Sequence, residues 1–119
     1  MKIIQTLNRF YVSDINAAVD FYEKLLDETC GMRFRYPQIN LELAQVGGIL
    51  LIGGPEEALK PFKGTQATFL VDSVTQYKEF LLRNGAFVVR DILKVPTGLN
   101  MTVRHADGTI VEYVEHKPS

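Results

Sequence analysis

The sequence contains an internal repeat, which limits the folds open to the chain more than any other feature. Residues 12–15 (Val-Ser-Asp-Ile) are matched 59 residues later by residues 71–74 (Val-Asp-Ser-Val), and Phe21 is matched by Phe80 at the same spacing. The chain has 119 residues, so two such units nearly fill it. A repeat is the signature of one supersecondary unit used more than once. We therefore expect two similar modules.

Both units show the same order of secondary-structure signals: one strand, one helix and three strands. Strand segments are rich in β-branched and aromatic residues, and helical segments place apolar residues three and four positions apart. Asp14, or its neighbour Ser13, can cap the first helix, and Ser73 with Gln76 forms a capping box for the second. The predicted elements of the first unit are a strand at 3–12, a helix at 15–26, and strands at 33–36, 41–44 and 49–52. Those of the second are a strand at 67–71, a helix at 74–83, and strands at 87–95, 99–104 and 109–115.

The repeated motifs resemble the vicinal-oxygen-chelate superfamily, which includes glyoxalase I, bleomycin-resistance proteins and extradiol dioxygenases. The resemblance lies in residues 12–15 followed by 21–26 (Phe-Tyr-Glu-Lys-Leu-Leu), in residues 69–74 followed by Asn84-Gly85, and in the final turn and strand at 106–112. It covers essentially the whole chain. It implies an α+β fold in which two tandem βαβββ modules form curled antiparallel or mixed sheets around a cavity, with helices on the outside.

The resemblance also implies a single domain over residues 1–119. The first module would cover about 1–54 and the second about 65–116. Residues 55–64 contain Pro61 and lie in a segment bounded by glycines, so we expect a linker or surface loop there.

Composition excludes several classes of function. The formal net charge is −1, with 13 Lys and Arg against 14 Asp and Glu, so we expect no nucleic acid partner. No apolar run approaches the ~20 residues that cross a bilayer, so we expect no membrane association. A single cysteine, Cys30, cannot form an internal disulfide, and we expect a cytoplasmic protein.

The metal ligands of the superfamily come from the first and last strands of each module. These positions correspond here to Leu7, Ile52, Gln66 and Glu112. Leucine and isoleucine offer no lone pair, so only Gln66 and Glu112 could coordinate, whereas a catalytic zinc site uses about three protein ligands. The resemblance therefore predicts no metal cofactor, and a divalent metal held by Gln66 and Glu112 is the alternative.

Strand alternation assigns side chains to the cavity, because successive residues of a strand point to opposite faces. For the last hairpin we expect a three-residue loop at 106–108 with Gly108 left-handed, which places Thr102 opposite Glu112. An ion pair between Arg9 and Glu112 is as good an interpretation as contact with a ligand. The predicted ligand-binding residues are Arg9, Tyr11, Gln66, Thr68, Thr102, Arg104 and Glu112.

Two functions fit this residue set. The first is a metal-independent small-molecule binding protein that sequesters a small organic ligand, as bleomycin-resistance proteins do, and this is the one we expect. The second is a metal-dependent lyase, isomerase or dioxygenase, similar to lactoylglutathione lyase, with an atypical ligand set, and whether the chain is an enzyme stays open. The resemblance also implies a homodimer. His105 and His116 are expected to be solvated.

Overall fold

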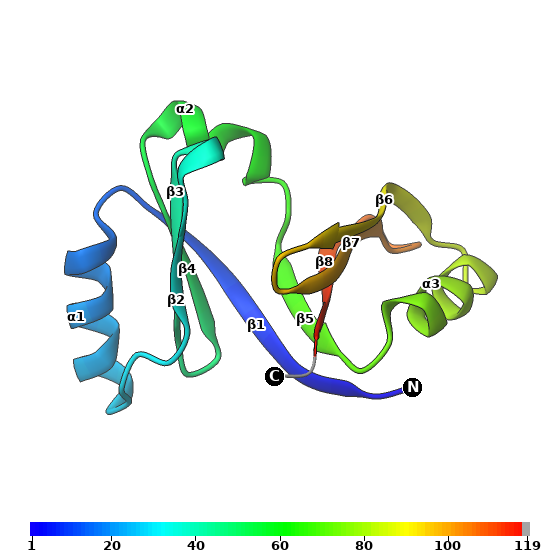
Figure 1. Cartoon of the computed structure of the whole chain (residues 1–119), viewed down its shortest axis with the longest axis horizontal. Coiled ribbons are helices and arrows are strands. Elements are labelled where there is room, and N and C mark those ends of the chain that lie inside the picture. Colours follow the sequence, from blue (N-terminus) through cyan, green and yellow to red (C-terminus); the bar gives the residue numbers. More distant parts are fainter. Residues whose placement is uncertain (118–119) are drawn as a thin grey trace. The chain divides into compact units, whose positions relative to one another are not determined.

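The computed structural model describes residues 1–117, and its elements follow the order of the repeat. Two repeated βαβββ modules appear, each with one long helix and four strands. The strands are β1 (Ile3–Val12), β2 (Arg33–Tyr36), β3 (Leu41–Val46), β4 (Ile49–Gly53), β5 (Ala67–Val71), β6 (Phe87–Val95), β7 (Gly98–Arg104) and β8 (Ile110–His116). The helices are α1 (Ile15–Leu26), α2 (Glu56–Leu59) and α3 (Val74–Arg83), with 3₁₀ turns η1 (Pro37–Ile39) and η2 (Lys60–Phe62). Figure 1 labels the strands and the α-helices.

The chain divides into two compact units. The N-terminal unit is Asn8–Gly64, and the C-terminal unit combines Met1–Leu7 with the segment from Thr65 onward. β1 therefore contributes to both. The hydrogen-bonded strand order is β2-β3-β4-β1-β5-β8-β7-β6. β1 runs parallel to β4 and β5 runs parallel to β8, whereas the pairs β2–β3, β3–β4, β6–β7 and β7–β8 are antiparallel, so the strand pairing is mixed.

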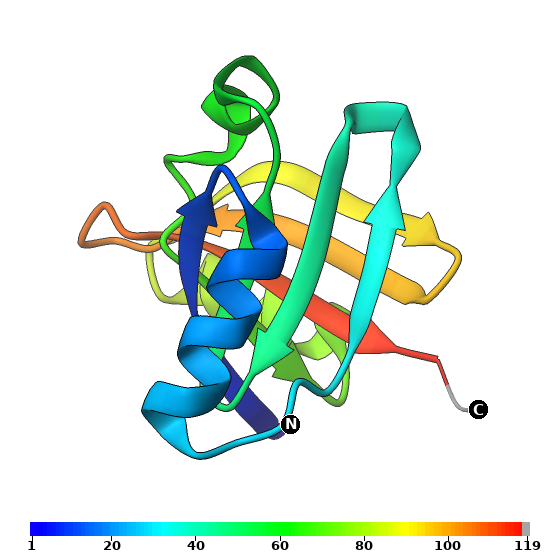
Figure 2. The ribbon, with the colours of Figure 1, turned by 90° about the vertical axis from the view of Figure 1, so that its left-hand side faces the viewer.

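In the N-terminal unit, α1 covers one face of the sheet (Figure 2). Asp14 caps the helix by accepting a hydrogen bond from the Ala17 amide at 3.1 Å, as the sequence predicted. Ile15 and Val19 of α1 pack against the buried side chains of Ala44, Val46 and Leu51. The start of α1 lies very close to the end of β4. A Cβ on Gly53 would lie 2.7 Å from the Ile15 Cβ, so this position has room only for glycine.

In the C-terminal unit, α3 covers one face of β5, β8, β7 and β6. Ser73 caps α3 by accepting from the Gln76 amide at 3.2 Å, and the Glu115 carboxylate accepts from the Val74 amide at 2.9 Å. The core beneath α3 is apolar and aromatic. Its buried residues are Val71, Val74, Tyr77, Leu81, Met101, Val103, Val111 and Tyr113.

The register of the last hairpin is the one that the sequence predicted. The His105 amide donates to the Thr109 carbonyl at 2.8 Å, and Gly108 has a φ of 95°, which favours glycine. Thr102 lies directly opposite Glu112. The three-residue loop is therefore confirmed, and with it the separation of polar and apolar faces on these two strands.

The segment predicted as a loop at 55–64 is instead partly helical, in α2 and η2. Pro55 occupies the N-cap position, Glu56 and Glu57 occupy the first turn, and acidic residues there are favoured by the helix dipole. Leu59 is buried. The Lys63 ammonium pairs with the Glu56 carboxylate at 2.9 Å, so local contacts order this short connection.

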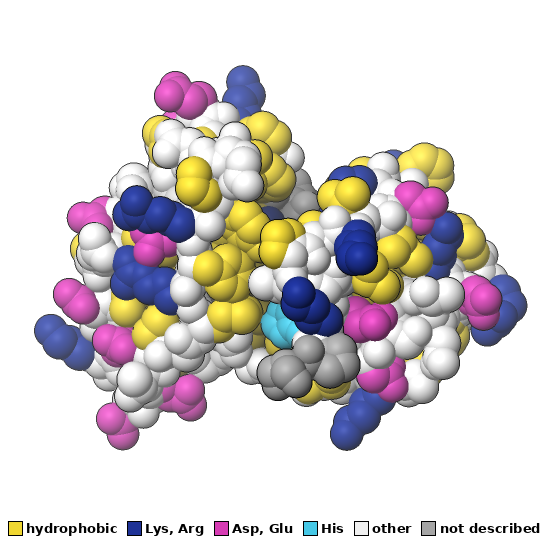
Figure 3. Space-filling view, in the orientation of Figure 1, with side chains coloured by type: hydrophobic (Ala, Val, Ile, Leu, Met, Phe, Trp, Pro, Cys, Tyr) yellow, Lys and Arg dark blue, Asp and Glu magenta, His cyan; other side chains and the backbone are white. Residues whose placement is uncertain are grey.

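The α+β class, the two βαβββ modules and the helix on one face of each sheet are confirmed. Among residues 1–117, none of the helices combines the length and the apolar character that crossing a bilayer requires. On the face shown in Figure 3, basic and acidic side chains are interspersed, which agrees with the formal net charge of −1.

Candidate functional site

The two faces of the C-terminal sheet differ in character. Met101 and Val103 of β7 are buried in the core beneath α3. Because side chains alternate along a strand, Asn100, Thr102 and Arg104 point to the opposite face. That face, which we call the open face, is the one that α3 does not cover.

A continuous polar row crosses the open face at one level. Thr68 of β5 lies beside Glu112 of β8, Glu112 lies beside Thr102 of β7, and Thr102 lies beside Arg90 of β6. Residues paired in this way point to the same face and have closely spaced side chains. Three of the four were predicted as ligand-binding residues, and the structure brings them together.

Side-chain hydrogen bonds fix both ends of this polar row. Thr68 is only 2% exposed, and its hydroxyl donates to the Glu112 carboxylate at 3.2 Å. Arg90 is half-buried, and its guanidinium donates to the Asn100 amide oxygen at 2.6 Å and to the Thr102 hydroxyl at 3.4 Å. These contacts hold the polar groups in place before any ligand arrives, which reduces the ordering cost of binding.

Arg104 lies at the edge of the open face. It is exposed, and its guanidinium carbon stands 5.0 Å from the centre of the Phe87 ring on the paired strand. This is a cation–π distance, and it confirms that Phe87 shares the face. Arg104 therefore presents its charge beside an exposed aromatic ring.

Gln66 precedes β5 and is exposed. Its side-chain oxygen accepts a hydrogen bond from the Ile110 amide at 3.3 Å, and the Gln66 amide donates to the Ile110 carbonyl at 2.8 Å. Both contacts join the start of β5 to the start of β8. Gln66 thus has a structural role at the end of the sheet, and its place among ligand-binding residues stays a prediction.

Arg9 and Tyr11 lie on β1 in the N-terminal unit, on the face opposite α1. The neighbouring Phe10 points toward the helix, since its ring contacts the Tyr22 ring of α1 at 5.5 Å between centroids. The Tyr11 hydroxyl donates to the Phe62 carbonyl at 2.5 Å, and the Arg9 guanidinium stands 5.5 Å from the Tyr11 ring centre. Tyr11 thereby ties β1 to η2.

The corresponding row of the N-terminal unit is almost entirely apolar. Tyr11 lies beside Ile52 of β4, Ile52 beside Leu43 of β3, and Leu43 beside Phe34 of β2. The two modules share a fold but carry different side chains on the faces away from their helices. The fixed polar groups belong to the C-terminal unit.

The residues at the superfamily's metal positions offer a poor set of ligands. Leu7 and Ile52 are apolar and are only 2% and 1% exposed. Glu112 is the one carboxylate among the four positions, and Gln66 adds only a neutral amide oxygen. Across residues 1–117, no three His, Cys, Asp or Glu side chains are arranged so that they could hold a metal ion. Such a donor set does not fit a catalytic divalent metal.

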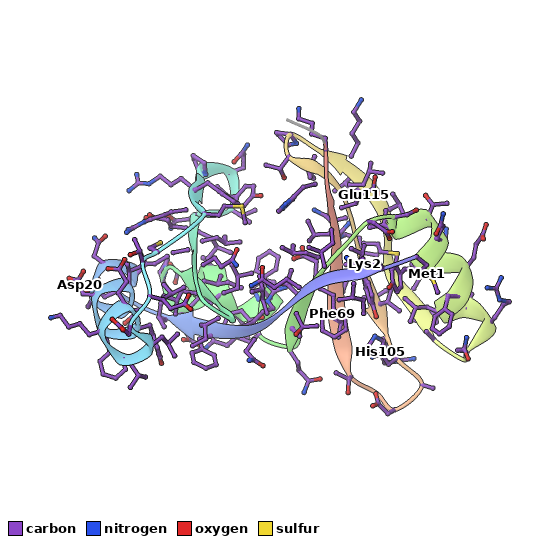
Figure 4. All side chains as sticks on the ribbon, turned by 90° about the horizontal axis from the view of Figure 1, so that it is seen from below. Met1, Lys2, Asp20, Phe69, His105 and Glu115 are labelled. Atoms are coloured by element: carbon purple, nitrogen blue, oxygen red, sulfur yellow. The ribbon has the colours of Figure 1, made fainter. Side chains whose placement is uncertain are left out.

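The prediction for His105 was wrong, because this residue is partly buried under the helix side of the sheet. Its Nε2 lies 2.7 Å from the Tyr113 hydroxyl. Its ring centre lies 6.4 Å from that of Phe69, and Figure 4 labels both of these residues. Burial, with a smaller contribution from Tyr77, raises the pKa of Tyr113 to about 12. Strand alternation could have predicted this burial. His105 is four residues after Met101, so both side chains point to the same face of the sheet, and Met101 was expected on the apolar side. His116 is exposed, as expected.

No family model and no curated protein match the sequence. Among solved structures, the crystal structure of an uncharacterised protein from Methanosarcina mazei matches with a TM-score of 0.92 and 61% sequence identity, over 98% of this chain and 95% of that chain. The chain belongs to the same family as this Methanosarcina mazei protein.

At lower sequence identity, similarity to solved structures shows the fold alone. Methylmalonyl-CoA epimerase from Mycobacterium tuberculosis matches with a TM-score of 0.75 at 16% identity, over 98% of this chain and 90% of that chain. A methylmalonyl-CoA epimerase in complex with methylmalonyl-CoA and NH4+ matches with a TM-score of 0.71 at 14% identity, over 98% and 100%. This enzyme is a vicinal-oxygen-chelate superfamily member, so the fold of that superfamily is shown.

Proposed function

We propose that the protein is a metal-independent binding protein for a small organic molecule. The observation that carries this proposal is the polar row of Thr68, Glu112, Thr102 and Arg90 on the open face. A few fixed polar groups among apolar side chains are typical of sites that bind small molecules. The polar row supplies hydrogen-bond donors and acceptors and one cation.

The comparisons support a small organic ligand without identifying it. Structures of methylmalonyl-CoA epimerase hold methylmalonyl-CoA or 2-nitronate-propionyl-CoA, so this fold accommodates organic acyl compounds in those proteins. Identity to them is only 14%, so their substrates are not transferred to this chain.

Metal independence is supported by the chemistry of the available ligands. Leu7 and Ile52 occupy two of the four metal-ligand positions of the superfamily and cannot coordinate a metal. The Glu112 carboxylate already accepts a hydrogen bond from the Thr68 hydroxyl. The runner-up function, a metal-dependent lyase, isomerase or dioxygenase, is favoured only by the retention of Glu112. It would need further ligands from elsewhere.

Native mass spectrometry of the protein as purified tests the proposal. We expect a fraction of the protein to carry an organic adduct that collisional activation ejects, and no stoichiometric metal. The same sample treated with EDTA should keep its melting temperature. Tight stoichiometric zinc, nickel or iron, together with a loss of stability in EDTA, would establish the metal-dependent alternative instead.

We further propose that the protein is a cytoplasmic homodimer without nucleic acid or membrane partners. Exposed apolar side chains on α1 support an interface between copies: Phe21 is 58% exposed and Leu25 is 62% exposed. Size-exclusion chromatography with light scattering should give twice the chain mass. Replacing Phe21 with serine should shift the mass toward that of one chain, whereas elution of the unchanged protein as a monomer at all concentrations would reject the dimer.

A further inference from the structure

Arg90 is a cation on the open face without an acidic partner. Its four hydrogen-bond acceptors are neutral oxygens: the carbonyl and side-chain oxygens of Asn100, the Thr102 hydroxyl and the Asp91 carbonyl, at 2.6 to 3.4 Å. Within residues 1–117, no carboxylate lies within 4 Å of its guanidinium. A half-buried charge normally has an opposite charge nearby, so this cation is held in place but not neutralised.

Arg104 is a second cation of this kind. It lies on β7, two residues after Thr102. Its guanidinium lies over the Phe87 ring, and it too forms no ion pair within the described chain. By contrast, Arg33 and Arg35 of the N-terminal unit both pair with Glu42, at 2.6 and 3.8 Å. On the open face, the guanidinium groups of Arg90 and Arg104 are therefore not in ion pairs with any carboxylate of the described residues.

Exposed apolar side chains stand on both sides of Arg90 along β6. Phe87 lies opposite Arg104, Arg90 opposite Thr102, and Leu93 opposite Asn100, so all three β6 residues point to the open face. Phe87 is 58% exposed and Leu93 is 50% exposed. An arginine flanked by two exposed apolar groups is complementary to an anion with an apolar body.

The charge of Glu112 limits how negative such an anion can be. Glu112 is two strands from Arg90 in the same polar row, which corresponds to about 10 Å at the usual strand spacing. A doubly charged group such as phosphate is repelled by this carboxylate more than a singly charged one, and phosphate has no apolar body to lie on Phe87 and Leu93. A carboxylate with a single charge suffers less repulsion and matches the planar fork of a guanidinium.

We infer that the ligand of the open face is a monocarboxylate with an apolar chain or ring, whose carboxylate binds at Arg90 and Arg104 and whose apolar body lies on Phe87 and Leu93. This inference rests on the proposed binding function and adds the chemical class of the ligand. It places the selectivity of the protein on β6 and β7.

A titration followed by ¹H–¹⁵N NMR tests the inference with three probes at equal ionic strength: hexanoate, its neutral counterpart hexanamide, and inorganic phosphate. We expect hexanoate to shift the amide signals of β6 (Phe87–Val95) and β7 (Gly98–Arg104). Hexanamide should bind at least tenfold more weakly, since it loses the hydrogen bond between a carboxylate and a charged guanidinium. Phosphate should also bind at least tenfold more weakly, since it has no apolar body to lie on Phe87 and Leu93.

Matched variants identify the group that binds the carboxylate. Arg90→Gln should weaken hexanoate at least tenfold, Arg90→Lys less, and Arg83→Gln, at an exposed site in the last turn of α3, less than twofold. If Arg90→Gln fails to fold, Arg104→Gln serves instead, with about a threefold loss expected.

Equal binding of hexanoate and hexanamide, or tighter binding of phosphate, would overturn the inference and leave the binding function standing. Shifts confined to the α3 side of the sheet, or no shift with any probe, would also overturn it. In those cases the adduct seen by native mass spectrometry decides separately whether the protein binds another class of molecule.

Discussion

At the scale of single residues, the hydrogen bond between Thr68 and Glu112 is a direct target. Replacing Thr68 with valine keeps its shape but removes the hydroxyl that donates to the carboxylate at 3.2 Å. Hydrogen bonds to charged groups contribute about 1.5–3 kcal/mol, so we expect a loss of about 2 kcal/mol in the free energy of unfolding. Urea denaturation measures this loss. Thr75→Val, at an exposed site on α3, is the control and should change stability by less than about 0.5 kcal/mol.

Tyr113 gives a prediction about alkaline pH. Burial raises its pKa from the ordinary value of 10.0 to about 12 in the folded protein. The fold therefore favours the neutral phenol, and the resulting stability is complete below pH 10 and is lost as the pH rises toward 12. We expect the unfolding free energy of the wild type to fall more steeply over this interval than that of Tyr113→Phe. Parallel curves for the two proteins would contradict the assigned shift.

At the scale of secondary-structure elements, the β6–β7 hairpin depends on Gly98. This glycine has a φ of 147°, and a Cβ there would lie 2.0 Å from the Glu115 carbonyl oxygen of β8. We expect Gly98→Ala to lower the unfolding free energy by about 3 kcal/mol through strain and overpacking. Gly64→Ala is the control, because its Cβ would meet no atom within 4 Å. Thermal unfolding should separate the two variants clearly, and equal melting temperatures would show that the hairpin can adjust.

Most elements could be predicted from the sequence because local signals agree with the final packing. Asp14 and Ser73 cap the helices that their positions indicate, and Gly108 sets the register of β7 and β8. The sequence did not predict the short helix α2, because Pro55 and the neighbouring glycines are typical of a loop. Its order comes from the burial of Leu59 together with the ion pair between Lys63 and Glu56, and proline and glycine signals do not reveal either contact.

The candidate site was predictable only where strand alternation holds. Thr68, Thr102 and Glu112 lie on regular strands, and their common face followed from counting residues. Arg90 was missed because β6 has irregularities between Val88 and Arg90 and again between Arg90 and Leu93. A bulge shifts the faces of the residues that follow it, so a period of two cannot place this arginine.

At the scale of the whole molecule, the two modules share a fold but differ in the side chains on the faces away from their helices. The N-terminal row at Ile52 and Leu43 is apolar, whereas the C-terminal row at Glu112 and Thr102 is polar. The duplication of backbone therefore does not imply a duplicated site. The directed polar contacts to a ligand are expected from the C-terminal unit.

A crystal structure of the protein as purified, without added ligand, tests the central claim most directly. We predict electron density for a small organic molecule on the open face, within hydrogen-bond distance of Thr102 and Arg90, and no metal ion on Glu112. Density for an organic molecule only on the helix-covered side of the sheet, or a metal ion bound by Glu112 and further ligands, would contradict it.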